Sequence, residues 1–596
     1  MLTSCNKEEL YIEKELLQEE EITTEEEEIG ENEFSVTLNE DFYETFENTG
    51  ITIDPSENDG EITTDIILSY TDPSNGVLSI ENESVIYTPN DGFTGEDSFV
   101  YKVCDGETGL ICFEATVTIS VLPVEEDDFA TELKAFPSAY GEVYNISGGR
   151  GGHVYHVTSL ADDGSVGTLR WAVNQPRPAT IVFDVSGVIQ LNYNLELGGK
   201  WNQTDDRHDN LTIAGQTAPE GGITLTTANN RTHVTLKDAN NVIIRYIRLR
   251  MQKDNEMVAF VIRGDWHTAN NIILDHVSIS YGGLMAIGMG GKGNYNCVIQ
   301  NSLIAESKTG VLFGDSDPNF QNFGNNNSFN GNLFYNVSHR HPNPNGNGRI
   351  DVINNIIHNP FYRLNSNTFS PKLNHINNYV SAGAWTGINF RRMNRAFSDH
   401  STYSQHGPTQ IYTSGNIIDN GIFTDADADN KLIWSKWNAG LEDQYAPTKE
   451  FVNSMHPLLG SPWPIKTARD AYNDAVRDKD KGASKSLNAD GTVTHYNDRH
   501  DAEYFSKMAE GEGAYEGYST YNIGGDFFNT ARYSSFIASI TGTPINTRPA
   551  DYDTDRDGMA DVWETAKFGD LSRDGKGDED GDGYTDLEEF LNMVDK

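Results

Sequence analysis

The residues Asn332-Leu333-Phe334-Tyr335 are one copy of a pattern that recurs along the middle of the chain. The copies, in order, are Tyr246-Ile247-Arg248-Leu249, His276-Val277-Ser278-Ile279, Asn301-Ser302-Leu303-Ile304, Asn332-Leu333-Phe334-Tyr335, Asn355-Ile356-Ile357-His358, Asn378-Tyr379-Val380-Ser381 and Asn416-Ile417-Ile418-Asp419. They begin 23 to 38 residues apart, about the length of one coil of a parallel β-helix with or without an inserted loop. Leucine-rich repeats have similar periods, but these copies are rich in Ile, Val and Asn and lack a helical half. The pattern therefore predicts a parallel β-helix.

Asparagine opens five of these copies. A side-chain amide carries both donors and an acceptor, so each asparagine can bond to its equivalent in the next coil. We expect five residues to form such a ladder at one turn of the helix: Asn301, Asn332, Asn355, Asn378 and Asn416.

The segment before the repeats, residues 34–124, alternates apolar and polar residues in short stretches separated by Asn, Asp, Gly and Pro. Alternation with period two predicts the half-buried sheets of a β-sandwich. Residues 87–101 are similar to bacterial cadherin-like or immunoglobulin-like repeats, which implies a spacer module. Cys104 and Cys112 are close enough for a local disulfide in an oxidising compartment, with unpaired core thiols as the alternative.

The N-terminal residues 1–33 are strongly acidic, with 13 Glu against two Lys, and the whole chain has a net charge of −47. Such a segment cannot bury enough apolar surface to fold, so we expect a solvated tether. The net charge also argues against nucleic acid as a partner, because it repels phosphate.

The residues Leu2-Thr3-Ser4-Cys5 resemble the end of a bacterial lipoprotein signal. This implies a lipid anchor at Cys5 and a place on the outer membrane of a Gram-negative bacterium. The charged and apolar parts of a signal peptide do not precede the motif, so either the chain starts inside a longer gene product or the match is accidental.

Two stretches near the C-terminus share one spacing of acidic residues. Their members are Asp553, Asp555, Asp557, Asp561 and Glu564, then Asp578, Asp580, Asp582, Asp586 and Glu589. Each stretch places oxygen donors at loop positions 1, 3, 5, 9 and 12 with glycine at position 6, the pattern of a calcium loop. No long helix precedes either loop, so residues 551–596 resemble dockerin and thrombospondin type 3 modules. We expect two structural Ca²⁺ ions there, with a solvated acidic tail as the alternative.

Five segments of the middle region occur in the order found in one known protein family. They are GGRGGHVYHVT (148–158), GTLR (167–170), IVFDVSG (181–187), LTIAGQTAP (211–219) and ILDH (273–276). Together they resemble the pectate lyases, family 1 of the polysaccharide lyases. The resemblance implies a right-handed parallel β-helix domain over residues 130–550. In its C-terminal part residues 467–476 look like one helix, and we expect this segment to wrap over the coils.

Enzymes of this family cleave a uronic acid chain by β-elimination. A base removes the C5 proton beside the carboxylate, and cations stabilise the negative charge that develops. In the family an arginine is the base, a lysine and a second arginine hold the substrate, and calcium bridges enzyme and carboxylate. The resemblance implies that Arg340, followed by His341-Pro342, is the base and that Lys308 binds the carboxylate.

Further candidates accompany this pair. A guanidinium acts as a base only in a crowded cationic, partly desolvated site, which Lys308 and Arg349 could provide. His339 and His341 titrate near neutrality and are fallback bases or substrate contacts. Two more arginines extend a positive groove or lie on a solvated loop: Arg391 and Arg392.

The sequence departs from the family pattern where catalytic calcium is held. The expected carboxylates correspond to Val258, Leu284 and Met285, which cannot bind a cation. Nearby acidic residues that could substitute are Asp254, Glu256, Asp315 and Asp317. The other readings are a calcium-independent lyase or a groove that binds without cutting.

The sequence thus predicts a mainly β, secreted or surface-tethered monomer that cleaves an acidic polysaccharide such as pectate. A non-catalytic polysaccharide-binding protein and a β-helix glycoside hydrolase are the alternatives. The expected parts are residues 1–33, 34–124, 130–550 and 551–596.

Overall fold

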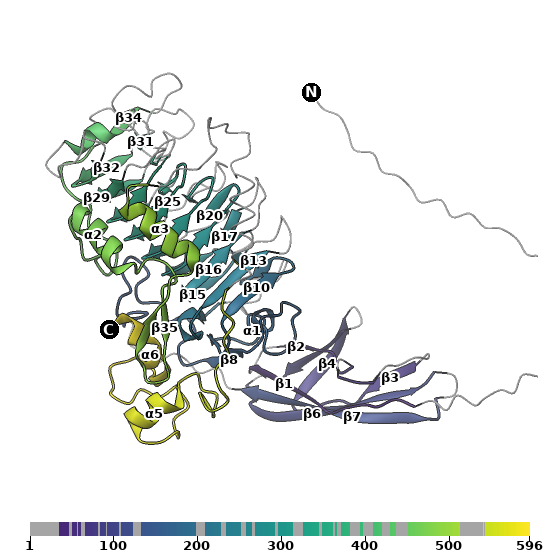
Figure 1. Cartoon of the computed structure of the whole chain (residues 1–596). Helices are drawn as coiled ribbons and strands as arrows, with labels where there is room; N and C mark the ends of the chain where they lie inside the picture. Colours follow the sequence, from purple (N-terminus) through teal and green to yellow (C-terminus); the bar gives the residue numbers. More distant parts are fainter. Residues whose placement is uncertain are drawn as a thin grey trace, which may run out of the picture. The chain divides into compact units, whose positions relative to one another are not determined.

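The computed structural model divides into two compact units, residues 1–124 and 125–596, each taken here by itself (Figure 1). It describes residues 35–46, 50–56, 58–60, 66–81, 84–90, 92–106, 109–122, 133–197, 209–227, 234–251, 258–264, 269–291, 296–313, 326–344, 348–360, 364–365, 371–381, 394–396, 409–419, 429–436, 451–512, 540 and 543–596.

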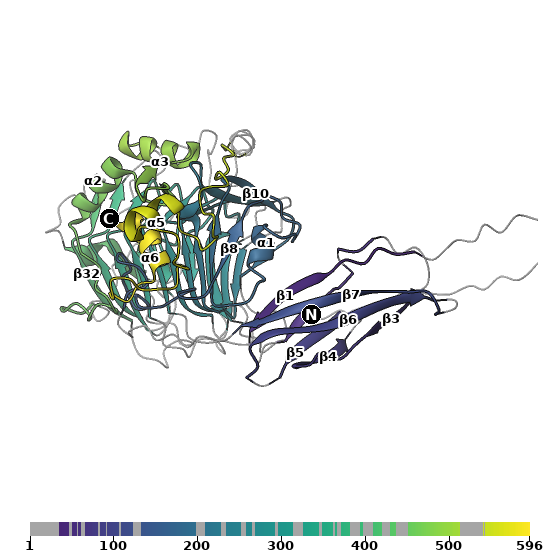
Figure 2. The same ribbon diagram turned by 90° about the horizontal axis from the view of Figure 1, so that it is seen from below.

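The first unit is a sandwich of two small sheets (Figure 2). Its strands are β1 (Asp41–Phe46), β2 (Ile51–Ile53), β3 (Ile66–Tyr70), β4 (Gly76–Glu81), β5 (Ser84–Pro89), β6 (Gly95–Asp105) and β7 (Cys112–Leu122). The sheets have the orders β1-β7-β6-β3 and β2-β5-β4, and they share one hydrophobic cluster. Val117 and Ile119 are fully buried and alternate with more exposed neighbours, as the period-two pattern predicts. A disulfide joins Cys104 to Cys112, so the predicted pairing is confirmed.

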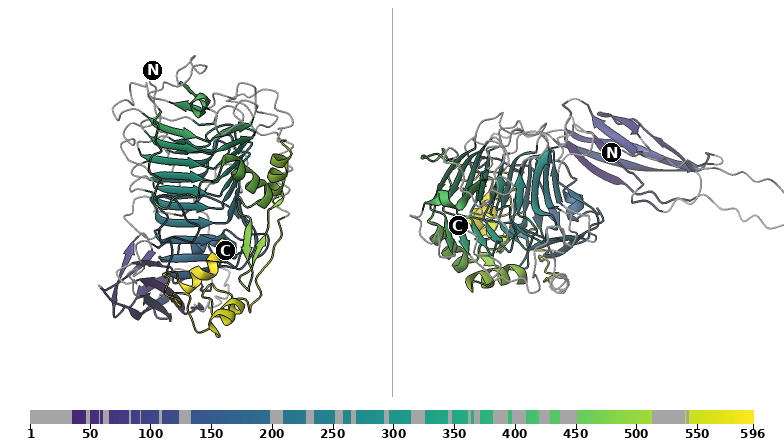
Figure 3. Two further views of the ribbon diagram at one scale, coloured as in Figure 1. Left: turned by 90° about the vertical axis from the view of Figure 1, so that its left-hand side faces the viewer. Right: turned by 90° about the horizontal axis from the view of Figure 1, so that it is seen from above.

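The second unit stacks parallel strands into three sheets, and from β9 to β26 the chain passes through them in turn (Figure 3). The ten-stranded sheet contains β8 (His153–Val157), β9 (Ala179–Phe183), β12 (Leu211–Ala214), β15 (Asn240–Arg245), β18 (Asn270–Asp275), β21 (Cys297–Gln300), β24 (Asn327–Asn330), β27 (Arg349–Ile353), β29 (Lys372–Ile376) and β32 (Gln410–Ser414). The nine-stranded sheet contains β10 (Gly187–Leu191), β13 (Ile223–Thr227), β16 (Ile247–Arg250), β19 (Ser278–Ser280), β22 (Leu303–Ala305), β25 (Leu333–Tyr335), β28 (Ile356–His358), β30 (Tyr379–Ser381) and β33 (Ile417–Asp419). The six-stranded sheet contains β11 (Leu195–Glu196), β14 (Val234–Lys237), β17 (Val258–Gly264), β20 (Met285–Gly291), β23 (Val311–Phe313) and β26 (Asn343–Pro344).

The interior of the stack consists of aliphatic and aromatic side chains in register. Five equivalent positions of successive coils are at most 3% exposed: Ile244, Leu274, Ile299, Phe329 and Val352. Each such side chain contributes about 1.5–3 kcal/mol by leaving water. The predicted parallel β-helix is therefore confirmed.

The asparagine ladder is present but begins one coil later than predicted. The amide nitrogens of Asn332, Asn355 and Asn378 each donate to the oxygen of the next asparagine at 2.8–3.0 Å, and Asn416 continues the ladder to Asn430 at 2.8 Å. The prediction for Asn301 was wrong.

At the first rung, Ser302 donates its N–H to Asn332 Oδ1 at 2.9 Å, so serine takes the place expected for asparagine. Asn301 instead occupies the left-handed region, with φ +48°, and its side chain accepts from Lys481 at 2.8 Å. Asparagine adopts this conformation more easily than most residues, which explains why it is common at the position just before the ladder.

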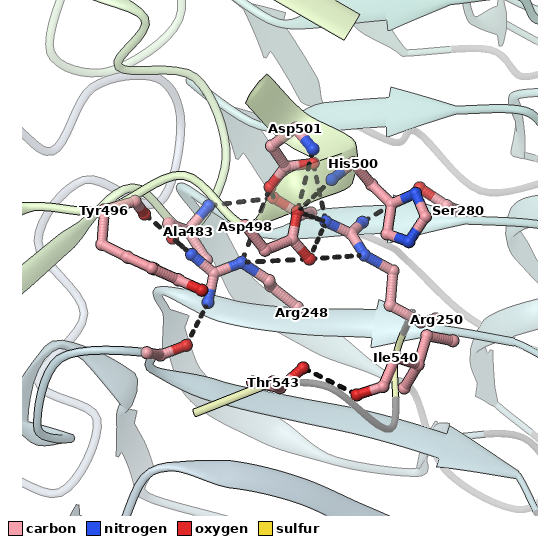
Figure 4. Close-up of polar contacts among 12 residues, drawn as sticks. Arg248, Arg250, Ser280, Ala483, Tyr496, Asp498, His500, Asp501, Ile540 and Thr543 are labelled. Carbon is pink, nitrogen blue, oxygen red and sulfur yellow. Dashed lines mark hydrogen bonds and ion pairs between the residues drawn. The ribbon is translucent and has the colours of Figure 1, made fainter. Parts of the chain in front are cut away.

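The C-terminal segment packs two helices, α2 (Ala468–Asp478) and α3 (Arg499–Ala509), against the nine-stranded sheet (Figure 1). The helix predicted at 467–476 is α2. Tyr504 of α3 packs with Leu333 in one apolar cluster. Arg250 of β16 is fully buried and pairs with Asp498 and Asp501 at 2.9 and 2.7 Å, as Figure 4 shows. Polar and apolar contacts together fasten this segment to the coils.

The last residues form a small module beside β8, the first strand of the stack (Figures 1 and 2). It contains α5 (Asp561–Phe568), α6 (Asp586–Leu591) and a final 3-10 helix (Asn592–Asp595). The smaller elements of the unit are α1 (Leu169–Ala172), the 3-10 helices Gly215–Thr217 and Asn430–Ile433, β31 (Asn394–Ala396), β34 (Trp434–Lys436), β35 (Lys485–Leu487) and β36 (Val493–His495). Within the described ranges, every helix is too short or too polar to cross a bilayer.

Candidate active site and calcium loops

Lys308 and Arg340 occupy the same corner of two successive coils. Lys308 lies just before β23 and Arg340 just before β26, and these strands are neighbours in the six-stranded sheet. The N–H of Val311 donates to the Arg340 carbonyl at 2.8 Å. A Cβ at Gly310 would lie 2.3 Å from the same carbonyl oxygen, so the close approach of the coils requires glycine there.

The guanidinium of Arg340 is held toward the Lys308 segment. Arg340 has φ +72°, a rare conformation for a residue with a side chain, and its side chain is half-buried. Its Nη1 donates to Thr309 Oγ1 at 3.3 Å, and Thr309 in turn donates to the Leu284 carbonyl at 2.7 Å. Lys308, also half-buried, is the residue before Thr309 in the chain. The structure therefore brings the two principal candidates together, and Thr309 is a participant that the sequence analysis missed.

The two candidate histidines differ in their surroundings. His341 is completely buried, and its ring nitrogens face the carbonyls of Leu364 and Val337 at 2.9 and 3.1 Å. A side chain enclosed in this way cannot touch a polysaccharide, so the structure removes His341 from the fallback bases and substrate contacts. His339 is 9% exposed, with Nδ1 against Ser338 Oγ at 3.1 Å, and it keeps a place beside Arg340.

Arg349 belongs to a different sheet. It opens β27 of the ten-stranded sheet, and its Nη1 donates to the Pro457 carbonyl at 3.3 Å on the segment that covers that face. The crowding of Arg340 by Arg349 that we expected is therefore not supported by any contact among the described residues. Arg391 and Arg392 lie outside the described residues.

The first acidic loop gathers five carboxylates. The oxygens of Asp553, Asp555 and Asp557 lie within 4.8 Å of one another, and so do those of Asp555, Asp561 and Glu564. Glu564 is completely buried, and neither of its oxygens has a hydrogen-bond partner in the part of the chain that the structure describes. A buried carboxylate without a partner is costly, whereas a hard cation with oxygen ligands compensates it. The residues present fit Ca²⁺.

The electrostatics of this loop agree with that fit. Burial, together with the negative charges of Asp557, Asp555 and Asp553, raises the pKa of Glu564 to about 8. Burial likewise raises the pKa of Asp557 to about 7, with repulsion from neighbouring aspartates. The pKa of Asp553 is raised to about 6 by burial, although His156 opposes the shift. Without a cation, the loop therefore resists the full ionisation of its own side chains.

The second acidic loop has aspartate at the same first three positions, but basic side chains contact its other carboxylates. Its leading carboxylates converge within 4.8 Å of one another: Asp578, Asp580 and Asp582. Asp586 is buried and accepts hydrogen bonds from Arg573 Nε and, at 3.1 Å, from the Glu579 N–H. The Lys567 ammonium lies against the Glu589 carboxylate.

Comparison with known proteins bears on both units. A family model described as a bacterial Ig domain matches residues 32–120, so the predicted immunoglobulin-like sandwich is confirmed. The "Probable pectate lyase C" of Aspergillus terreus is 31% identical over 337 residues, which cover 55% of this chain and 74% of that relative. The chain belongs to the pectate lyase family.

Other relatives share less of their length with this pectate lyase family member. The protein of the same name from Aspergillus flavus is 33% identical over 281 residues, 45% of this chain, and the chain spans only 59% of that relative. A solved structure similar to the chain is that of Jun a 1, the major allergen from cedar pollen. It has 16% identity and a TM-score of 0.42, and the match covers 58% of this chain and 92% of that one.

The positions where the family resemblance predicts catalytic calcium carry apolar residues in this chain. Val258 of β17 pairs in register with Met285 of β20, and both side chains are half-buried. Leu284, also half-buried, lies one coil before Thr309 and accepts its hydroxyl. These side chains do not fit a cation. The acidic residues that could substitute lie outside the described residues: Asp254, Glu256, Asp315 and Asp317.

Proposed function

We propose that the chain is a polysaccharide lyase that cleaves an acidic, uronate-containing polysaccharide such as pectate by β-elimination. The observation that carries this proposal is the placement of Arg340 and Lys308 at one corner of adjacent coils, linked through Thr309 Oγ1 at 3.3 Å from Arg340 Nη1. Membership of the pectate lyase family supports the same chemistry.

In the proposed reaction Arg340 is the base. Its neutral guanidine takes the proton from C5 of the sugar, the electron pair left on C5 forms the C4=C5 double bond, and the C4–O4 bond breaks. The departing O4 takes a proton from water. Lys308 binds the C5 carboxylate and stabilises the charge that develops there.

An arginine is a demanding choice of base, because a guanidinium normally keeps its proton. A neighbouring positive charge and partial burial both disfavour the charged form. Lys308 supplies the charge from the preceding coil, and the half-buried position of Arg340 supplies the burial. His339 is the second candidate base of this corner.

We propose that this reaction proceeds without calcium at the family's usual positions, because Val258, Leu284 and Met285 occupy them. Calcium is assigned instead to the two C-terminal loops, where it would have a structural role. The same apolar positions favour the second candidate function, a groove that binds an acidic polysaccharide without cutting it.

We further propose an extracellular or cell-surface location. The Cys104–Cys112 disulfide supports an oxidising compartment. A lipid anchor at Cys5, a Gram-negative outer membrane and a monomeric state remain part of this proposal, and Cys5 lies outside the described residues.

The test is to incubate the full chain with polygalacturonate and follow the ultraviolet absorbance of the unsaturated product. Arg340→Ala should lower the rate roughly 100- to 10,000-fold, the range expected for loss of a general base. Arg499→Ala, which removes an exposed arginine of α3, is the matched control and should retain full activity. Binding to the polymer with no absorbance change in the parent protein would favour the non-catalytic alternative.

A pH profile separates the two candidate bases. With Arg340 as the base, kcat/KM should keep rising above about pH 8, because the neutral guanidine becomes more abundant. A profile that levels off near pH 7 would instead assign the base to His339.

A further inference from the structure

The two acidic loops match in sequence but differ in the charges that face them. Around the first loop the groups in contact with the carboxylates are mostly acidic. A histidine faces the first carboxylate of this loop, with His156 Nε2 at 3.5 Å from Asp553 Oδ2. Four carboxylate oxygens of this loop have no hydrogen-bond partner in the described structure: Asp553 Oδ1, Asp557 Oδ2 and both oxygens of Glu564.

In the second loop, two basic side chains lie against the carboxylates. Lys567, in the last turn of α5, lies against Glu589 at position 12, where Glu564 stands in the first loop. Arg573 bonds to the buried Asp586 at position 9 and also to Glu579. Asp586 is therefore compensated from within the chain, and the Lys567 ammonium faces the Glu589 carboxylate, whose Oε2 has no hydrogen-bond partner among the described residues.

The first loop also lies directly on the β-helix. A Cβ on Gly558, at loop position 6, would lie 2.9 Å from Val154 of β8, and Gly558 has φ +93°. His156 of the same strand faces Asp184 at 3.0 Å and the Arg556 carbonyl at 3.2 Å. The calcium loop thus touches the first strand of the stack with both backbone and side chains.

The helices that follow the loops also pack against the β-helix. Trp563, Leu587 and Phe590 share one buried cluster with Ala214 and Tyr246 of the coils. Two buried ion pairs reinforce it, Arg150 with Glu588 at 2.8 Å and Arg245 with Asp595 at 2.6 Å. These three apolar side chains are therefore buried in the cluster shared with the coils rather than presented to a partner.

We propose that the two loops are not equivalent: the loop at 553–564 binds a calcium ion that clamps the C-terminal module onto the first coil, whereas Lys567 and Arg573 take the place of an ion in the loop at 578–589. This inference rests on the assignment of calcium to these loops and is independent of the lyase reaction. It makes residues 551–596 a structural part of the β-helix unit, and it locates a calcium requirement of the enzyme far along the chain from Arg340.

Calcium titration of the full chain by isothermal calorimetry tests the inequality. We expect one equivalent bound by the parent protein. Asp555→Asn and Asp580→Asn form a matched pair, because both residues are exposed and stand at position 3 of their loops. The first change should abolish binding and the second should leave it intact. Lys567→Ala should add a second equivalent, because it frees Glu589 for an ion.

Two equal equivalents in the parent protein, or loss of binding in Asp580→Asn, would overturn the inequality. No binding at all would overturn the assignment of calcium itself, while leaving the lyase assay with Arg340→Ala unaffected.

The clamp is tested by hydrogen exchange of the same proteins. Removal of calcium should speed exchange at least tenfold in the amides of 553–564 and also in those of 153–157, the strand that the loop touches. Faster exchange confined to the loop would show that the ion does not hold the first coil. Asp555→Asn with calcium present should reproduce the calcium-free pattern, which guards against effects of the chelator.

Discussion

Arg340 owes its position to two neighbouring residues rather than to its own conformational preference. Its left-handed backbone, with φ +72°, is one that a side chain disfavours, so the surrounding contacts must hold it. The backbone is fixed by the Leu364 carbonyl at 2.9 Å, and the guanidinium by the Thr309 hydroxyl at 3.3 Å. Strain of this kind is common at reactive positions, because a fixed geometry saves reorganisation during the reaction.

Thr309→Val tests the positioning of this guanidinium. The substitution keeps the shape of the buried side chain but removes the hydroxyl that accepts from Arg340 and donates to Leu284. We expect kcat to fall by about 10-fold, the equivalent of one lost hydrogen bond of about 1.4 kcal/mol, with little change in KM. Thr309→Ser keeps the hydroxyl and should retain most of the activity. Equal rates for the valine and serine variants would remove Thr309 from the site.

At the scale of single elements, the asparagine ladder explains how the coils keep their register. Asn355 is completely buried, and it accepts from Asn332, donates to Asn378 at 3.0 Å and donates to the Phe329 carbonyl at 2.7 Å. One side chain thus connects three coils. A shift of register would leave several buried amides without partners.

Asn355→Ala should therefore lower the free energy of unfolding by about 2–4 kcal/mol, because it leaves buried partners unsatisfied on both sides. Asn473→Ala, on the exposed face of α2, is the control and should change stability by less than about 0.5 kcal/mol. Both values come from denaturant unfolding followed by circular dichroism. A small loss for Asn355 would mean that the ladder follows the fold rather than stabilising it.

The repeat was predictable because its signal is local: each copy carries its own strand and turn. The exact rung was not, because Asn301 and Asn332 look alike in sequence although one adopts the left-handed conformation and the other bonds along the stack. The pairing of Lys308 with Arg340 could be predicted only through the family resemblance. The displacement of Arg349 to another sheet and the burial of His341 depend on where the chain turns between sheets, which single motifs do not encode.

At the scale of the whole β-helix unit, distant segments are fastened to the coils by buried charges. Arg250 is fully buried and bonds to Asp498, Asp501 and Ser280 (Figure 4). Arg248 beside it donates to the Ala483 and Tyr496 carbonyls. The contacts of Arg248 and Arg250 with residues 483–501 join segments more than 200 residues apart along the chain, so the sequence alone does not predict them.

Arg250→Ala should destabilise the unit by about 3–5 kcal/mol, because it leaves two carboxylates buried without their partner. Arg477→Ala removes an exposed arginine that pairs with Asp474 and Asp478, and it should cost less than about 1 kcal/mol. Thermal unfolding of the two variants against the parent protein measures both effects. Similar losses would show that the buried network contributes no more than a surface pair.

The stability of the whole unit should also depend on pH in a way that calcium reverses. The pKa values of Asp553, Asp557 and Glu564 are raised to about 6, 7 and 8 in the folded protein, against about 4 in the unfolded chain. The folded state therefore binds protons more tightly, and this contribution is present below about pH 4 and lost as the pH rises to about 8. The melting temperature of calcium-stripped protein should fall across that window. With calcium it should rise instead, because the ion binds only the ionised carboxylates. Melting curves at pH 5 and 8, with and without calcium, measure the difference, and an identical decline in both series would contradict a cation site in the first loop.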